Sequence, residues 1–218
     1  MRKLVIRLVV FDVDGTLTQH SSIWWRIHEL FGTTKEGKQY YDQYFAGTIN
    51  YDQWADYDAA LWKDRPLAKV LEVVHNARLA NGAKETIQVL KDHDINLAIL
   101  SGGLDIMAES IAQRVGIDFV LTNKLHHRDG VLTGTVENLV AWGEKSREIP
   151  KIANHFGLSL EETAFIGDGR NDVSVFSIVG LSIAFNPEHQ EVADAADVVI
   201  RDNNLRMVLP YIIPEYQL

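Results

Sequence analysis

The chain has 218 residues, no cysteine and a formal net charge of −9, with 46% hydrophobic and 23% charged residues. Such a composition is typical of a globular protein, and the lack of cysteine excludes disulfides and thiolate catalysis. The acidic balance argues against nucleic acid or an anionic membrane surface as a partner, because both bind basic patches. No apolar run approaches the roughly 18 to 20 residues of a membrane-spanning helix. Arg7 breaks the first apolar stretch, so we expect no signal peptide and a cytoplasmic protein.

The first expected element is a buried strand formed by the apolar run 8–11, which leads directly to Asp12 and Asp14. A run of Leu, Val and Phe before a glycine turn is typical of a core strand, and open α/β sheets bind ligands at the carboxyl ends of their strands. Two carboxylates in that place repel each other and lose hydration unless a cation, a shared proton or hydrogen-bond donors compensate them. We therefore expect a metal ion there.

Residues 18–80 differ from the rest of the chain because they hold four of the five tryptophans and show no convincing strand pattern. The pattern predicts helices over 23–31, 36–45, 51–63 and 67–80. We interpret this segment as an α-helical cap domain, inserted into a core domain formed by residues 1–17 and 81–218. An insertion beside a strand end can act as a lid.

Strands and helices alternate along the rest of the chain. Further helices are expected over residues 83–93, 104–115, 145–156, 173–179 and about 204–210. Further strands are expected over residues 95–100, 119–122, 163–166, 181–185 and 198–200. The first of these runs into a glycine turn at 101–103, and Asp129-Gly130 between extended runs predicts a small β-hairpin. The alternation predicts an α/β fold with a doubly wound, Rossmann-like and mostly parallel sheet.

Four polar clusters lie at strand ends or helix starts in this scheme. They are Asp12 with Asp14, Ser101 with Gly102, Lys145, and Asp168 with Asn171 and Asp172. In this order they resemble the haloacid dehalogenase superfamily of phosphohydrolases, and most closely its phosphoserine-phosphatase-like branch with a helical cap. The resemblance covers nearly the whole chain. Its most specific parts are Asp-Val-Asp-Gly-Thr-Leu-Thr at 12–18 and Gly-Asp-Gly-Arg-Asn-Asp at 167–172.

The resemblance implies catalysis by two aspartates and a magnesium ion. Asp12 is expected to be the nucleophile that forms an aspartyl-phosphate, and Asp14 the general acid that becomes the base for water. An ionised carboxylate cannot donate a proton, so we expect a raised pKa for Asp14. Mg²⁺ is expected to bind the carboxylates of Asp12 and Asp168 and the backbone carbonyl of Asp14.

The resemblance also assigns the groups that hold the phosphate. The Ser101 hydroxyl and the Gly102 amide are expected to bind its oxygens. Lys145 is expected to place its ammonium between the nucleophile and the phosphate. Asn171 is expected to contact the phosphate, and Asp172 is expected to orient the metal-bound waters without binding the metal itself.

The predicted cap departs from the phosphoserine phosphatases, which use a glutamate and an arginine there to bind the serine group. The aligned positions are Ser21 and the stretch 54–58, which has no basic residue and whose Asp56 and Asp58 would repel a carboxylate. We therefore expect a small phosphorylated metabolite other than phosphoserine. The aromatic residues of the cap are candidates for contacting it, or else form the core of the cap itself. The candidates are Trp24, Trp25, His28, Tyr44 and Trp54.

Three other functions remain open. The chain could transfer the phosphoryl group to an acceptor other than water, or it could be a phosphoserine phosphatase proper. A phosphoaspartate signalling receiver also carries an acidic pair after its first strand, but its phosphorylated aspartate lies on a later strand. The oligomeric state cannot be predicted from the sequence.

Overall fold

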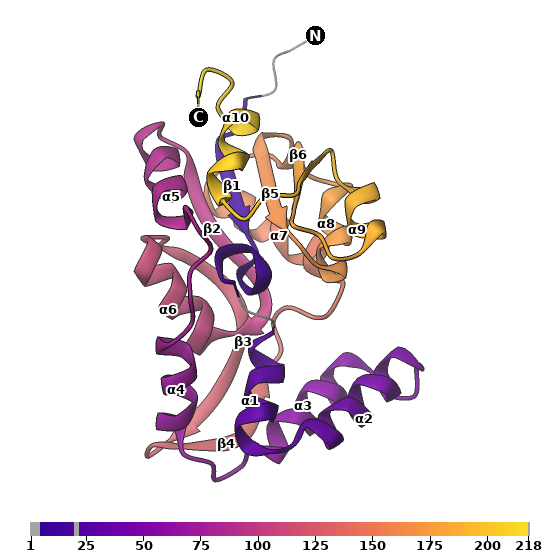
Figure 1. Ribbon diagram of the computed structural model, residues 1–218. Helices are drawn as coiled ribbons and strands as arrows, with labels where there is room; N and C mark the ends of the chain where they lie inside the picture. The colour runs from indigo at the N-terminus through magenta and orange to yellow at the C-terminus, as the bar shows by residue number, and fades with distance from the viewer. Residues whose placement is uncertain (1–4, 20–21, 218) are drawn as a thin grey trace.

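The computed structural model describes residues 5–19 and 22–217. In that part of the chain seven strands form one sheet with the order β4-β3-β2-β1-β5-β6-β7 (Figure 1). Neighbouring strands run parallel, except that β3 and β4 form an antiparallel hairpin. The strands are β1 (Leu8–Phe11), β2 (Asn96–Leu104), β3 (Phe119–Arg128), β4 (Val131–Glu137), β5 (Thr163–Gly167), β6 (Leu181–Phe185) and β7 (Val198–Ile200). The predicted doubly wound, mostly parallel sheet with a small hairpin is confirmed.

β1 lies in the middle of the sheet, paired with β2 on one side and β5 on the other. The chain builds outward from β1 through β2 and β3, and later builds in the opposite direction through β5, β6 and β7. The strand order therefore reverses beside β1. In open α/β sheets this reversal opens a crevice at the carboxyl ends of the strands, where ligands bind.

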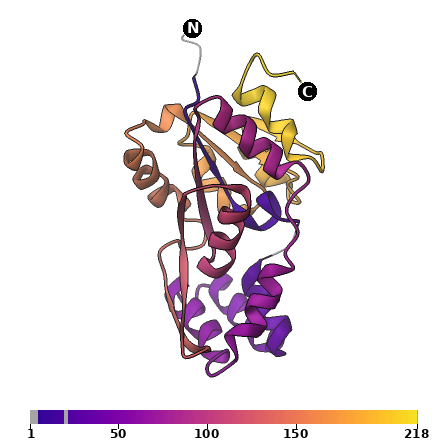
Figure 2. The ribbon, with the colours of Figure 1, turned by 90° about the vertical axis from the view of Figure 1, so that its left-hand side faces the viewer.

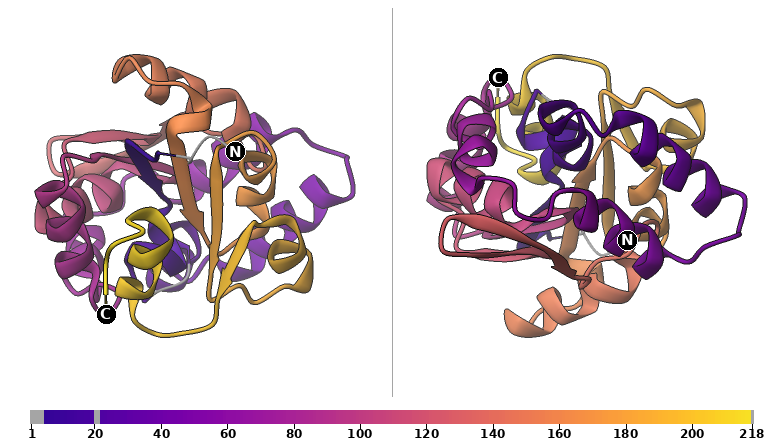
Figure 3. Two further views of the ribbon diagram at one scale, coloured as in Figure 1. Left: turned by 90° about the horizontal axis from the view of Figure 1, so that it is seen from above. Right: turned by 90° about the horizontal axis from the view of Figure 1, so that it is seen from below.

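Helices cover both faces of the sheet, which is why β1 is apolar at every position. Val9 and Phe11 pack into one buried cluster, and Leu8 and Val10 into the other, because successive side chains of a strand point to opposite faces. Helices α5, α6 and α10 cover the first face, and α7, α8 and α9 the second (Figure 3). These helices are α5 (Ala83–Asp92), α6 (Asp105–Val115), α7 (Lys145–His155), α8 (Val173–Phe176), α9 (Gln190–Ala195) and α10 (Leu209–Ile212). Shorter turns are η1 (Val13–Leu17), η2 (Leu160–Glu162), η3 (Arg170–Asp172) and η4 (Leu205–Val208).

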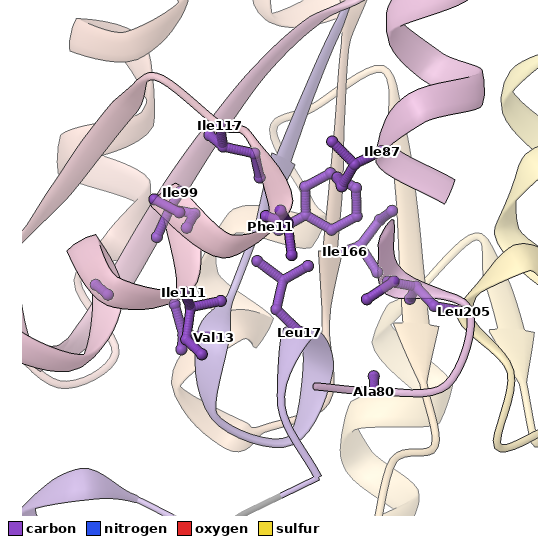
Figure 4. Packing of buried hydrophobic residues seen from close by; sticks show 14 of the residues in the cluster. Phe11, Val13, Leu17, Ala80, Ile87, Ile99, Ile111, Ile117, Ile166 and Leu205 are labelled. Carbon is purple, nitrogen blue, oxygen red and sulfur yellow. The ribbon is translucent and has the colours of Figure 1, made fainter. Parts of the chain in front are cut away.

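Phe11 fixes the end of β1 in the core. It is fully buried, and its ring lies beside Ile87 and Ile166 (Figure 4). Leu17, at the other end of turn η1, is fully buried in the same cluster. Burial of apolar surface, worth roughly 25 cal/mol per Å², thus anchors both ends of the turn that carries the two predicted catalytic aspartates.

Four helices lie between turn η1 and helix α5 in the chain (Figure 2). They are α1 (Ile23–Phe31), α2 (Thr34–Phe45), α3 (Tyr51–Leu61) and α4 (Leu67–His75). Figure 1 shows α1, α2 and α3 together at the end of the molecule away from α10. No helix in the described ranges is long and apolar enough to cross a membrane. The division into a core and a cap at residues 18–80 stays a prediction.

This helical segment is joined to the hairpin as well as to β1. The Asp64 N–H donates to the Leu132 carbonyl at 2.9 Å, and the Leu132 N–H donates to the Arg65 carbonyl at 2.9 Å. Pro66 and Val131 form a further bridge. The connection after α3 is therefore held against the β3–β4 turn.

Several predicted boundaries are wrong, among them the end of strand 119–122, since β3 extends to Arg128, and the end of helix 173–179, since α8 ends at Phe176. Contacts between distant segments explain two others. Helix α4 ends at His75 instead of residue 80, because the chain beyond it pairs with the segment after β1: the Ala80 N–H donates to the Leu17 carbonyl at 2.8 Å. The glycine sequence 101–103 is not a turn but part of β2, whose pairing with β3 shifts register between Leu100 and Leu104. Glycine permits such an irregularity inside a strand.

Candidate active site

Asp12 and Asp14 follow β1 directly and lie in different surroundings. Asp12 is buried, and its Oδ1 lies 2.8 Å from the ammonium of Lys145. The Oδ2 of Asp14 accepts a hydrogen bond of 3.0 Å from the N–H of Ile23, the first residue of α1. Burial and then the charge of Asp12 raise the pKa of Asp14 to about 7, although the Ile23 N–H, Lys145 and Arg26 lower it. Asp14 can therefore carry a proton near neutral pH, as a general acid requires.

Lys145 is fully buried at the start of α7 and bridges two carboxylates. Its Nζ lies 2.8 Å from Oδ1 of Asp12 and 2.5 Å from Oδ1 of Asp172. Burial alone would lower the pKa of Lys145, but the charges and hydrogen bonds of Asp12 and Asp172 more than offset this and raise it. The lysine therefore stays charged and fixes the positions of the two carboxylates relative to each other.

Asp168 and Asp172 come from the segment that follows β5. The N–H groups of Asp168 and Gly169 donate to Oδ2 of Asp172 at 3.1 and 3.0 Å, so both oxygens of Asp172 are engaged once Lys145 is counted. Thr16 donates to Oδ1 of Asp168 at 3.0 Å. Burial, followed by the charges of Asp12 and Asp172, raises the pKa of Asp168 well above its usual range. Within the described residues Asp168 makes no ion pair, and the charge of Lys145 compensates it only in part.

The acidic residues fit a divalent metal ion. Carboxylate oxygens of Asp12, Asp168 and Asp172 all lie within 4.8 Å of one another. Among the residues that the structure describes, Lys145 is the cation that forms ion pairs with these carboxylates. The negative charge of the three aspartates therefore exceeds the single positive charge of the lysine. A hard cation with oxygen ligands would remove that excess.

Gly15 packs against Asp168 in a conformation that other residues avoid. Its φ is +86°, and a Cβ atom there would lie 2.2 Å from Oδ2 of Asp168. We expect Gly15→Ala to displace that carboxylate and to weaken metal binding by about 10- to 100-fold, measured by titrating Mg²⁺ against the midpoint of thermal unfolding. Gly32→Ala is the matched control, because Gly32 has φ +71° but nothing within 4 Å of the added methyl group. Equal metal affinity of the two variants would contradict this role of Gly15.

Ser101 and Gly102 reach the site from β2. Ser101 is buried, and its Oγ accepts a hydrogen bond of 3.0 Å from the Gly103 N–H. The Gly102 carbonyl accepts 3.1 Å bonds from the indole N–H of Trp24 and from the side-chain amide of Asn123. The peptide after Gly102 is therefore held from two sides, one of which belongs to α1.

Asn123 is an organising residue that the sequence analysis missed. It is fully buried in β3, and its Nδ2 also donates to the Val140 carbonyl at 3.1 Å and to the Tyr51 hydroxyl at 2.9 Å. It thereby connects the glycine sequence of β2 with α3 and with the segment that precedes Lys145. A polar residue directly after the predicted strand 119–122 was the available signal for it.

A cavity of about 370 Å³ opens over the ends of β1 and β5. It is lined by the predicted residues Asp12, Asp14, Ser101, Gly102, Asp168 and Asn171. Lys145 and Asp172 are buried and do not line it. The structure thus brings all four polar clusters together, with the lysine behind the carboxylates rather than in the cavity wall.

The five aromatic candidates of the helical segment divide into two groups. Trp24 and Trp54 line the cavity. Trp25 is partly exposed, and His28 is buried away from the cavity. Tyr44 stacks on Trp54 with ring centroids 4.8 Å apart and does not line the cavity itself. His28 and Tyr44 therefore belong to the packing of the helical segment, and Trp25 lies at its surface.

Several further lining residues were not among the predicted site residues, and three of them have large or charged side chains near the aromatic wall: Tyr51, Asp58 and Trp142. Tyr51 and Asp58 lie three residues before and four residues after Trp54 on α3, so helical periodicity was a signal that could have identified them. Trp142 lies outside the helical segment, and nothing local marks it. Ser21, the residue aligned with the cap glutamate, lies outside the described residues.

The site lies where the strand order of the sheet reverses, and it combines two aspartates, a buried lysine and a strand-end serine. This combination defines a hydrolase of the haloacid dehalogenase type. Residues 9–177 match the family described as haloacid dehalogenase-like hydrolase, and the chain belongs to this family. Its relatives place it in the phosphoserine-phosphatase-like branch, so it is a phosphatase of this type.

These relatives are similar over nearly the whole chain. A phosphoserine phosphatase of Methanocaldococcus jannaschii is 36% identical over 207 residues, which are 94% of this chain and 97% of that protein. A substrate-bound phosphoserine phosphatase structure has a TM-score of 0.81 at 35% identity and covers 97% of this chain and 100% of its own. A structure described as a phospho-aspartyl intermediate analogue of phosphoserine phosphatase has a TM-score of 0.82 at 35% identity, covering 95% of this chain and 99% of its own.

Proposed function

We propose that the protein is a Mg²⁺-dependent phosphomonoester hydrolase that acts on a small phosphorylated metabolite through an aspartyl-phosphate on Asp12. The observation that carries this proposal is the contrast between two aspartates at one strand end. Asp12 lies 2.8 Å from the ammonium of Lys145, whereas burial raises the pKa of Asp14 to about 7. Two neighbouring carboxyl groups whose surroundings differ in this way can take different roles, one as the ionised nucleophile and the other as the protonated acid.

In the first step a carboxylate oxygen of Asp12 attacks phosphorus, and the bond between phosphorus and the ester oxygen breaks. Asp14 gives its proton to the departing alkoxide, which leaves as an alcohol. The Ser101 hydroxyl, the Gly102 amide and Asn171, all of which line the cavity, would hold the phosphoryl oxygens. Lys145, which is buried on the side of Asp12 away from the cavity, holds the carboxylate in position for the attack.

In the second step the ionised Asp14 takes a proton from water, and the water oxygen attacks the phosphorus of the aspartyl-phosphate. The acyl phosphate bond breaks, inorganic phosphate leaves, and the Asp12 carboxylate is restored. The same residue thus acts first as acid and then as base, as a pKa close to neutrality permits.

Mg²⁺ would be held by the carboxylates of Asp12 and Asp168 and the carbonyl of Asp14, and it would neutralise charge on the transferred group. Asp172 fits an orienting role, because both of its oxygens already accept hydrogen bonds or ion pairs. The chemistry of this donor set, which is all oxygen, favours magnesium over softer metals.

Mg²⁺ is expected to stabilise the fold. At about 100 times its Kd it adds about 2.7 kcal/mol to the free energy of unfolding, which raises the thermal midpoint of a domain this size by about 5 to 10 °C. Scanning calorimetry with EDTA or Mg²⁺ measures the shift. Asp168→Asn should lose most of it, whereas an unresponsive wild-type midpoint would contradict the metal site.

The helical segment 18–80 is proposed to be a cap over the cavity, with Trp24 and Trp54 in contact with the leaving group. Their places in the cavity wall support this. The absence of cysteine is compatible with the reducing cytoplasm as the location.

The experiment that tests this function is a screen of phosphomonoesters with Mg²⁺, including phosphoserine, sugar phosphates and nucleotides. Release of phosphate by the wild type but not by Asp12→Asn would support it. If the phosphoryl group is instead passed to another acceptor, added alcohols or sugars will lower the yield of free phosphate at constant substrate consumption. The similarity to phosphoserine phosphatases keeps phosphoserine itself in the screen.

A further inference from the structure

A buried carboxylate faces the part of the cavity that the leaving group would enter. Asp58 of α3 is only 3% exposed, yet it lines the same cavity as Asp12 and Asp14. Its Oδ1 lies 3.2 Å from Nε2 of the buried His28, and Nδ1 of that ring lies 2.8 Å from the Thr33 hydroxyl. Asp58 is therefore held in place by a built arrangement of side chains.

Asp58 is a buried acid whose charge is compensated only in part. Burial raises its pKa, and a hydrogen bond and the charge of His28, together with a hydrogen bond from Trp54, partly counter this. Its Oδ1 faces Nε2 of His28 at 3.2 Å but makes no hydrogen bond of good geometry within the described residues. A buried carboxylate in a cavity wall that is compensated only in part favours a cation in that cavity.

Aromatic rings form the wall around this carboxylate. Trp24, Tyr51, Trp54 and Trp142 all line the cavity. The Trp54 ring lies 6.0 Å from the Tyr51 ring and 6.3 Å from the Trp142 ring, so residues of α3 and of the loop before α7 meet here. The faces of such rings attract organic cations.

The charges along the cavity favour a cation over an anion. Neither lysine nor arginine is among the described residues that line it, whereas Asp58 and Glu188 both do. Lys145 is buried behind Asp12, and Arg26, whose charge reaches Asp14, does not line the cavity. A carboxylate on the leaving group would thus meet acidic residues and no basic partner.

We propose, on the basis of the function proposed above, that the substrate is the phosphate ester of a small amino alcohol without a carboxylate, whose ammonium group binds Asp58 among the tryptophan rings. Hydrolysis follows the two steps already given. The bond between phosphorus and the ester oxygen breaks, and the amino alcohol leaves with the proton of Asp14. Asp58 acts on binding and not on the transferred group.

The test compares choline phosphate with 3,3-dimethylbutyl phosphate, a neutral ester of the same shape in which carbon replaces the charged nitrogen. The wild type should show a kcat/KM ratio of about tenfold or more in favour of the choline ester. In Asp58→Asn the ratio should fall to about two, while Asp56→Asn, an exposed neighbour on α3, keeps the wild-type ratio. Because both esters are measured on one variant, a general loss of activity cancels.

A second variant covers the case in which Asp58→Asn does not fold. Trp142→Leu should lower the ratio severalfold, and Trp142→Phe should restore part of it because an aromatic face is retained. A wild-type ratio near one would overturn the inference, as would higher kcat/KM for glycerol phosphate or phosphoserine, or a high ratio unchanged in Asp58→Asn. Each of these outcomes leaves the hydrolase intact. No hydrolysis of any ester, including p-nitrophenyl phosphate, would instead refute the proposed function and the inference with it.

Discussion

Asp12→Asn is expected to lower kcat for every phosphomonoester by at least about 10⁴-fold, as does removal of a nucleophile that works as part of a unit. The amide cannot form the acyl phosphate, and the ion pair of 2.8 Å with Lys145 loses its negative partner. The variant should still fold, because it removes one negative charge from a cluster of three carboxylates. The measurement is steady-state phosphate release with Mg²⁺.

The matched control is Asp56→Asn, which makes the same chemical change at an exposed position on α3. Acid quenching of the wild type during turnover, followed by mass spectrometry, should find the phosphoryl group on the peptide that contains Asp12. A phosphoryl group on another residue would contradict the proposed nucleophile. Stable labelling of Asp12 without turnover would instead favour a signalling receiver.

The second large effect concerns Asp14 and the pH dependence of catalysis. Because burial raises its pKa to about 7, Asp14 is protonated below that pH and ionised above it. Donation to the leaving alkoxide needs the protonated form, so kcat/KM for alkyl phosphates should fall about tenfold per pH unit above 7. The profile is best measured above about pH 6.5, where the substrate phosphate is already mostly dianionic.

Asp14→Asn should lose about 10²- to 10⁴-fold in kcat/KM for alkyl phosphates, together with the decline above pH 7. With p-nitrophenyl phosphate the loss should be much smaller, because nitrophenolate leaves without a proton. This pair of esters separates loss of the acid from general damage to the site. A decline above pH 7 that persists unchanged in Asp14→Asn would assign the titration to another group.

The parts of the active site that could be predicted are those carried by local patterns. The run 8–11 had to be a strand buried on both faces, and the polar residues at strand ends had to meet where parallel strands terminate together. Helix α1 was predicted with its observed bounds, since its apolar spacing and Gly32 define both ends. These features depend on neighbours within a few residues, which a sequence displays directly.

Other features depended on contacts between distant segments. Helix α4 stops at His75 because the following residues pair with the chain after β1. The glycines 102 and 103 stay in β2 because its pairing with β3 resumes beyond them, at Leu104 opposite Asn123. Trp142, from the loop before α7, meets Trp54 of α3, and no local pattern predicts that encounter.

Asp12 and Asp14 illustrate how the two kinds of information combine. The sequence by itself predicted the class of reaction, through the resemblance of the motifs at 12–18 and 167–172 to the haloacid dehalogenase superfamily. The tertiary structure alone decided their electrostatics, since Lys145 and Ile23 approach from α7 and α1. It also decided which side chains line the cavity. The physical reason is that a cavity wall is assembled from elements far apart in the chain, and only packing brings them together.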